Sequence, residues 1–114
     1  MSPMKTVVIK EGMPSIEQAR ARLSSELRIA QRDGFKVLKL VHGYGSSGVG
    51  GDLRIALQST LRQMAQKHEI LDCIFGECWR TSDERSWELL KKMPELKSDS
   101  DLGKGNRGIT LVVL

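Results

Sequence analysis

Hydrophobic and polar positions in the first 41 residues follow a strand period, then a helix period, then a strand period again. Residues 6–10 form a short β-branched run, which predicts a strand. Apolar residues then recur at steps of three and four, which predicts an amphipathic helix ending near Gly34: Ile16, Ala19, Leu23, Leu27 and Ala30. Residues 35–41 predict a second strand. Because a helical crossover joins the two strands, we expect them to lie parallel in a βαβ unit.

The next segment repeats the alternation of helix and strand. A second amphipathic helix is predicted from about Asp52 to residue 68, with an apolar face made of Leu53, Ala56, Leu57, Leu61 and Met64. Residues 71–75 predict a third strand, in which Cys73 faces the core. The final strand, residues 109–114, is an uninterrupted apolar run, which is typical of a strand buried on both faces.

Between the third and last strands lies a longer connection, residues 77–105. Ser82 or Asp83 is expected to cap a short helix there, and Pro94 follows its end. Trp79 and Trp87 are expected to cover one face of the sheet, and the remainder predicts loop. Residues 1–114 therefore predict a single α/β (α+β) domain, a two-layer sandwich with a βαβ unit and further strands in a mixed four-stranded sheet.

Composition narrows the function classes without choosing among them. A chain of 114 residues has room for one core but not for a cofactor domain plus a substrate domain. Eighteen Lys and Arg against fourteen Asp and Glu give a formal charge of +4, which permits attraction to a polyanion. No apolar run is long enough to span a membrane and no signal peptide is recognised, so a cytoplasmic location and no membrane partner are expected. A monomer is the default expectation, because the sequence does not indicate an oligomeric state. Cys73 and Cys78 are expected to be free thiols.

The densest group of candidate site residues follows the second strand. His42 is followed by a glycine-rich loop and then by a helix: Gly43, Tyr44, Gly45, Ser46, Ser47 and Gly48. Backbone amides of such a loop, together with a helix N-terminus, favour bound phosphate. The loop satisfies G-x-G-x-x-G, but it follows the second strand, and the acidic residues at about the right distance, Glu69 and Asp72, do not come after the third strand. A dinucleotide-binding site is therefore not predicted.

Other candidates are expected to gather around this loop. Lys10, Glu11 and His42 follow strands whose carboxyl ends share one edge of the sheet. If the last strand is antiparallel, the loop before it brings Lys104 and Arg107 to the same edge, and Arg54 lies in the first turn after the glycine loop. His42 either donates to phosphate, acts as a general acid or base, or orders the loop. Tyr44 either stacks on a base or packs over the neighbouring helix.

Two segments resemble the small MutS-related (Smr) domain family. The sequence His42-Gly43-Tyr44-Gly45 followed by Leu53-Arg54 is similar to the family's H-G-x-G motif and the L-R that opens the next helix. Residues 105–114 are similar to its glycine-rich turn and last strand. The resemblance implies a fold like the C-terminal domain of translation initiation factor three, and it implies binding to DNA or RNA.

Family members also include nicking endonucleases and ribonucleases, many of which carry L-D-L-H-G at the end of the first strand. The matching residues 8–12 have neither the acid nor the histidine at that place. Nucleic-acid binding through phosphate contacts is therefore the leading prediction. The alternatives are an endonuclease with His42 as acid or base and Glu11 as a substitute acid, and a module for a small anionic ligand or a partner. No metal ligands or cofactor are predicted, and a divalent metal is expected only for the endonuclease.

Overall fold

The computed structural model describes residues 2–44 and 49–114, with seven regular helices and strands in these ranges. In chain order they are β1 (Met4–Val8), α1 (Ile16–Arg32), β2 (Val37–Val41), α2 (Val49–Gln66), β3 (Asp72–Phe75), α3 (Glu84–Lys92) and β4 (Ile109–Val113). Two short 3₁₀ turns, η1 (Gly76–Cys78) and η2 (Pro94–Ser98), flank α3. No helix among the described residues is long and apolar enough to cross a membrane.

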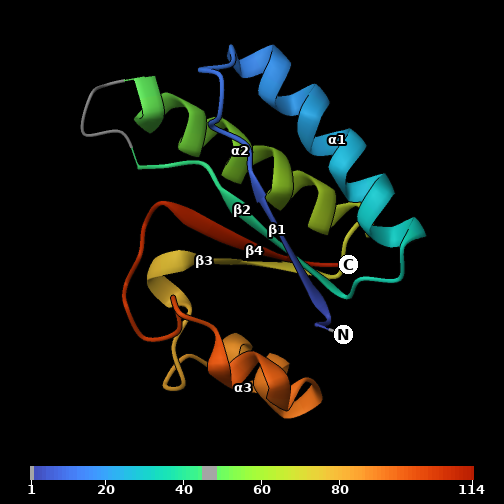
Figure 1. Ribbon diagram of the computed structural model, residues 1–114, viewed down its shortest axis with the longest axis vertical. Coiled ribbons are helices and arrows are strands. Elements are labelled where there is room, and N and C mark those ends of the chain that lie inside the picture. Colours follow the sequence, from blue (N-terminus) through green and yellow to red (C-terminus); the bar gives the residue numbers. More distant parts are fainter. Residues whose placement is uncertain (1, 45–48) are drawn as a thin grey trace.

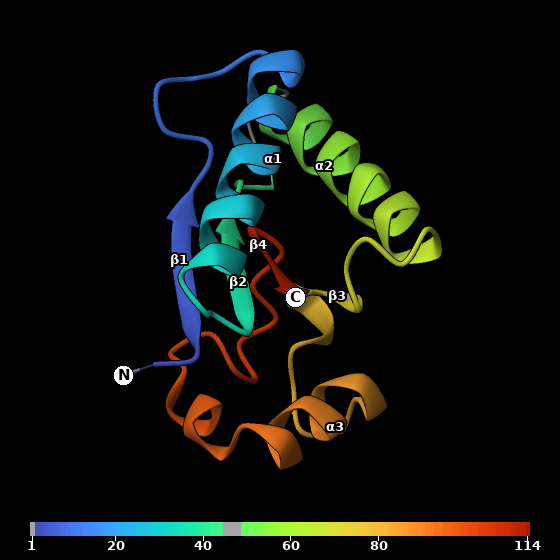
Figure 2. The same ribbon diagram turned by 90° about the vertical axis from the view of Figure 1, so that its right-hand side faces the viewer.

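The four strands form one mixed sheet in the order β1-β2-β4-β3, which Figure 2 shows from left to right. Strand β1 pairs parallel with β2, and β4 pairs antiparallel with both of its neighbours. The predicted α/β fold with a βαβ unit and a mixed four-stranded sheet is thus confirmed. In this register Val8 lies beside Val41, and Val41 beside Ile109, so β4 begins at the edge where β1 and β2 end.

Two core clusters cover opposite faces of the sheet. Helices α1 and α2 lie over one face and α3 over the other, above and below the strands in Figure 1. Leu38 and Leu40 of β2 belong to the cluster under α1 and α2, whereas Ile109 and Leu111 of β4 belong to the cluster with α3. The sequence predicts two layers, the sheet and one layer of helices. The connection between β3 and β4, which contains α3, packs against the other face of the sheet and adds a partial third layer.

The caps explain where the helices start. Ser15 and Gln18 form a capping box at the N-terminus of α1, since each side chain accepts a hydrogen bond from the other residue's backbone N–H. The Asp83 carboxylate accepts the backbone N–H of Ser86 and caps α3, as predicted. Helix α2 begins at Val49, three residues before the predicted start at Asp52.

The first strand lies two residues earlier than predicted. Its pairing begins where the backbone N–H groups of Lys36 and Val37 donate to the carbonyl of Pro3, and regular pairing ends with Val8. Lys10 therefore lies in the turn after β1, rather than in the strand. The second strand likewise begins at Val37, rather than at residue 35.

The prediction for the two tryptophans is half right. Trp79 is fully buried in the α3 cluster, whereas the side chain of Trp87 is 44% exposed. Helix α3 turns Ser86, Leu89 and Leu90 inward, and this leaves Trp87 at the border of the buried face. Cys73 is buried and both cysteines are free, as predicted.

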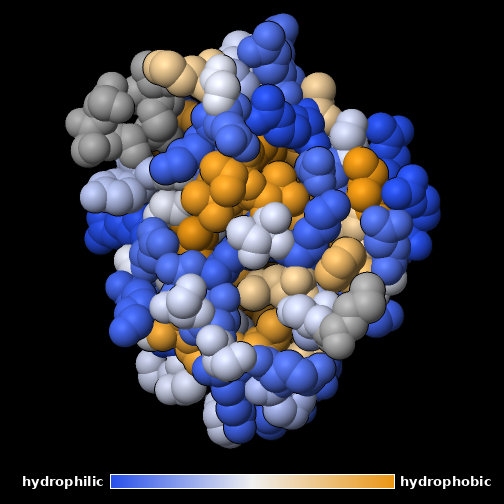
Figure 3. Space-filling model, viewed as in Figure 1, coloured by the Kyte–Doolittle hydropathy of each residue, from blue (hydrophilic) through white to orange (hydrophobic). Residues whose placement is uncertain are grey.

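Strand β1 lies at the edge of the sheet, and some of its side chains are exposed to solvent. Thr6 and Val8 are exposed. In the view of Figure 3, an apolar patch near the centre is surrounded by mostly hydrophilic side chains.

Candidate functional site

Two glycine segments meet at the carboxyl edge of β2. The backbone N–H groups of His42 and Gly43 both donate to the carbonyl of Gly108, at 2.9 and 3.0 Å. Gly43 has a φ of 74°. A Cβ built at Gly108 would lie 3.4 Å from the Cα of Gly43, so the two glycines pack closely. The expected antiparallel last strand therefore brings the end of the loop before β4 against the start of the glycine loop after β2.

The ring of His42 is buried and uses both nitrogens in hydrogen bonds within the protein. It is 1% exposed, with Nδ1 2.6 Å from the carbonyl O of Gly43 and Nε2 2.9 Å from Oγ1 of Thr110. Because a carbonyl only accepts, Nδ1 carries the proton and Nε2 accepts the Thr110 hydroxyl proton. The Thr110 hydroxyl in turn accepts from Nε2 of Gln58 at 3.2 Å. The network is complete with a neutral imidazole.

Burial is the main influence on the charge of this ring. Desolvation lowers the pKa of His42 below its ordinary value, and the positive charge of Arg54 acts in the same direction. The hydrogen bond to Gly43 and the charge of Glu77 raise the pKa, but by less than desolvation lowers it. A neutral ring that holds the Gly43 carbonyl fits the loop-ordering role of His42, since neither nitrogen is free to take a substrate proton in this conformation.

Basic side chains lie beside the joined glycines. A Cβ built at Gly43 would lie 3.5 Å from Cδ of Lys10, so the stem of this exposed lysine passes next to Gly43. Arg107 is exposed and directly precedes Gly108. We call these four residues, Lys10, Gly43, Arg107 and Gly108, the glycine rim. Lys104 is also exposed, in the turn three residues before Arg107.

Arg54 lies close to His42 and forms a half-buried ion pair. Its Nη1 is 4.0 Å from Oε2 of Glu77, and the two side chains are 25% and 34% exposed. Nε of Arg54 and Oε1 of Glu77 are buried and have no hydrogen-bond partner among the described residues. Buried polar atoms are normally satisfied by protein, water or ligand, so this pair has spare capacity to bind.

The remaining candidates are divided among different environments. Tyr44 is 57% exposed, so its ring does not pack over the neighbouring helix as a buried side chain.

The turn after β1 is held by Arg22. Its Nη1 donates to the carbonyls of Ile9 and Glu11, at 3.0 and 2.9 Å. The Glu11 carboxylate is exposed and forms no contact with His42 among the described residues. Gly45, Ser46, Ser47 and Gly48 lie outside the described residues.

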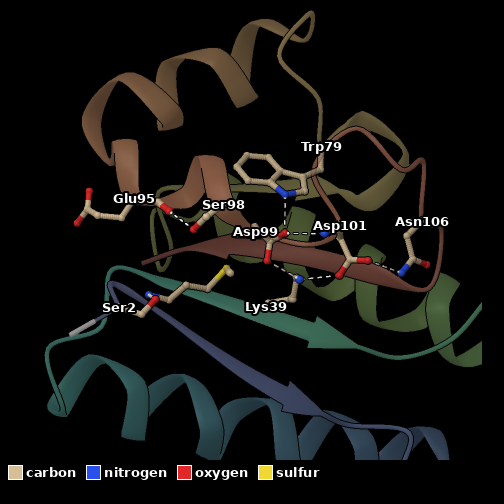
Figure 4. A network of polar contacts seen from close by, with 9 residues as sticks. Ser2, Lys39, Trp79, Glu95, Ser98, Asp99, Asp101 and Asn106 are labelled. Atoms are coloured by element: carbon tan, nitrogen blue, oxygen red, sulfur yellow. Dashed lines mark hydrogen bonds and ion pairs between the residues drawn. The ribbon is translucent and has the colours of Figure 1, made fainter.

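A buried ionic cluster anchors the segment before the glycine rim (Figure 4). Nζ of Lys39, a residue 4% exposed on the α3 side of β2, lies 2.7 Å from Oδ1 of Asp99 and also contacts Asp101. Nε1 of Trp79 donates to the other oxygen of Asp99 at 2.9 Å. Burial lowers the pKa of Lys39, but its hydrogen bonds to Asp101 and Asp99 outweigh this and raise the pKa.

From this cluster a chain of hydrogen bonds leads to the rim. Nδ2 of Asn106 donates to Asp101 at 3.0 Å, and Oδ1 of Asn106 accepts the backbone N–H of Gly108 at 2.8 Å. Hydrogen bonds from Asn106 and then Lys39 lower the pKa of Asp101. The position of Gly108, and with it that of Gly43, is therefore fixed from both faces of the sheet.

Comparisons with protein-family models, curated proteins and solved structures find no match. Within residues 2–44 and 49–114 no group of three His, Cys, Asp or Glu side chains is placed to hold a metal ion.

The sequence alone does not identify several residues that take part in the site. Gln58, Glu77 and Asp101 are polar residues in segments expected to be helix or loop, with no motif to mark them. One signal was available for Lys39. A lysine that alternates with Val37 and Val41 in a central strand points into a covered face, and it therefore requires acidic partners there.

Proposed function

We propose that this chain is a Smr-like domain that binds DNA or RNA by contacts to the phosphate backbone at the glycine rim. The observation that carries the proposal is the pair of hydrogen bonds from His42 and Gly43 to the Gly108 carbonyl. They bring two glycine segments together and place Lys10 and Arg107 beside them. The exposed lysine and arginine side chains beside these joined segments suit phosphate oxygens, which accept hydrogen bonds and carry negative charge.

The wider charge distribution supports a polyanionic ligand. The chain carries a formal charge of +4, and Arg54 adds a guanidinium close enough to His42 to lower the pKa of its ring. The Arg54 side chain is 25% exposed, which allows its guanidinium group to donate to a phosphate oxygen or to a bridging water. The element order and the mixed sheet are also compatible with the resemblance drawn from residues 42–54 and 105–114.

Binding is favoured over cleavage by the state of His42. A general base needs a nitrogen within hydrogen-bond reach of the proton that it removes. Here Nε2 accepts from Thr110 and Nδ1 donates to Gly43, inside a buried pocket that lowers the pKa of the ring. In this arrangement His42 holds the rim in shape and the basic side chains contact the phosphates.

Salt-dependent binding tests this proposal. Fluorescence anisotropy with labelled single-stranded and duplex oligonucleotides, between 50 and 200 mM salt, is expected to show a steep loss of affinity, because each neutralised phosphate adds about 0.7 to 0.9 to the slope. The double variant Lys10→Glu/Arg107→Glu should lower that slope by about two units and weaken binding at least about ten-fold.

The matched control reverses two charges at the opposite edge of the sheet. Lys36 is exposed just before β2, and Arg32 is exposed at the end of α1. Lys36→Glu/Arg32→Glu changes the net charge by the same amount and should leave most of the affinity and slope intact. Binding that ignores salt, or equal losses in the two double variants, would contradict a phosphate site at the glycine rim.

A further inference from the structure

A groove lies between the outer face of α2 and the end of β3, one helical turn beyond Arg54. This open surface groove has a volume of about 460 Å³, and its lining includes Ile55, Gln58, Arg62, Gln63, Gln66 and Phe75. Arg62 is the one charged residue in that lining, so the groove is complementary to an anion. Of these residues, only Gln58 also belongs to the hydrogen-bond network of His42.

One wall of the groove carries an aromatic ring with a guanidinium group over it. The Arg62 guanidinium carbon lies 4.7 Å from the centroid of the Phe75 ring, and Arg62 is exposed. A cation–π contact holds the guanidinium group over the ring. Unpaired nucleic-acid bases stack on aromatic rings and on arginine planes, so the outer face of this pair is a stacking platform.

The near end of the groove connects to the rim by hydrogen bonds. Gln58 is 7% exposed, and its amide nitrogen donates to Thr110, whose hydroxyl is bonded to His42. Gln58 and the exposed Ile55 both belong to the lining of the groove. An amide beside an apolar surface suits a base, which has a polar edge and an apolar face.

We infer that this groove holds an unpaired base of a nucleotide whose phosphate contacts the glycine rim. The inference rests on the proposed function, and it makes single-stranded rather than duplex nucleic acid the ligand. In a duplex the bases are stacked on each other, and their faces do not reach the platform of Arg62 and Phe75. From residue 55 to residue 66 the helix rises about 16 Å, which gives room for a few successive nucleotides.

The test separates stacking from charge. Anisotropy is measured with a 12-nucleotide single strand, in DNA and RNA forms, and with a hairpin duplex of the same sequence. Arg62→Lys keeps the charge and removes the planar guanidinium, while Arg28→Lys makes the same change on α1. We expect the wild type to prefer the single strand. Arg62→Lys should weaken single-strand binding about ten-fold with an unchanged salt slope, and Arg28→Lys should have little effect.

The outcomes distinguish this inference from the proposed function. Equal or tighter binding of the duplex, or full single-strand affinity in Arg62→Lys, would overturn the groove while leaving phosphate binding at the rim. A second arm measures melting temperature with adenosine monophosphate. Stabilisation of the wild type but not of Arg62→Lys, without binding of any oligonucleotide, would support the groove and overturn the nucleic-acid proposal. No binding of any of these ligands would overturn both.

Discussion

Nε2 of His42 lies 2.9 Å from Oγ1 of Thr110, across the antiparallel pair of β2 and β4. This contact joins the residue that opens the glycine loop to the strand that follows Gly108. Together with the bond from Nδ1 to the Gly43 carbonyl, it makes a neutral, buried imidazole part of the frame that shapes the rim.

Stability should therefore depend on pH through His42. Its pKa in the folded protein is lowered from the ordinary 6.5, so the unfolded chain binds a proton more readily. This stabilisation is complete above about pH 6.5 and is lost as the pH falls towards the lowered value. Urea unfolding between pH 5 and 8 should show a decreasing free energy of unfolding on acidification.

Two variants identify the group that titrates. His42→Asn should flatten the pH dependence and lower stability. His68→Asn should keep the dependence, because His68 is exposed and has a φ of 61°, which asparagine tolerates. Wild-type stability that is constant across this pH range would contradict a buried neutral His42.

Removing the Lys39 ammonium from its buried ion pair with Asp99 should strongly destabilise the protein. Both side chains are buried, at 6% and 7% exposed, so Lys39→Met would leave the Asp99 charge without its cation. Removing one partner of a buried pair costs about 3 kcal/mol or more, which urea unfolding measures directly. Lys36→Met, on an exposed neighbour, should cost no more than about 0.5 kcal/mol. Equal stability of the two variants would show that the cluster in Figure 4 is not a stabilising contact.

Much of this fold follows from period and order along the chain. The helix from Ile16 and the apolar last strand are marked by spacing alone, and the helical crossover between the first two strands implies their parallel pairing. The meeting of His42 with the turn before Ile109 follows from the antiparallel last strand. These features depend on local pattern and on a few topological rules.

Other features depend on contacts that local pattern does not encode. The strand limits at Met4 and Val37 are set by hydrogen bonds to Pro3, and a run of β-branched residues does not reveal these. The Lys39 cluster joins residues 60 and 62 positions apart. Arg54 with Glu77 likewise joins two elements separated by a strand. Their partners become evident only when the connection between β3 and β4 is seen to pack against the sheet.

Gly76 should tolerate no side chain. A Cβ there would lie 1.8 Å from the carbonyl O of Asn106, which is backbone and has little freedom to move away. Gly76→Ala should destabilise the protein by about 2 kcal/mol or more and displace the segment that leads to Gly108. Gly12→Ala is a useful comparison, since that position has open space and only a positive φ, of 81°, so about 1 kcal/mol is expected. Thermal unfolding of both variants checks the order of these costs.

Glu77 should compete with a bound phosphate for Arg54. The ion pair at 4.0 Å is partly exposed, and pairs of this kind contribute at most about 1 kcal/mol. Glu77→Gln should therefore raise oligonucleotide affinity by up to about five-fold, measured by anisotropy at constant salt. Glu69→Gln, an exposed change of the same charge outside the site, controls for net charge. Weaker binding by Glu77→Gln alone would mean that Glu77 positions Arg54 for its ligand.

The most direct test is a titration of ¹⁵N-labelled protein with a short single-stranded oligonucleotide. The chemical shifts of the backbone amides are measured at each step of the titration. If phosphate binds at the glycine rim, the largest changes in amide chemical shift should occur around Lys10, Gly43 and Gly108, with further changes near Arg54 and Arg62. Shifts confined to the opposite edge of the sheet, around Gly34 and Lys36, or no shifts at saturating oligonucleotide, would contradict phosphate binding at the glycine rim.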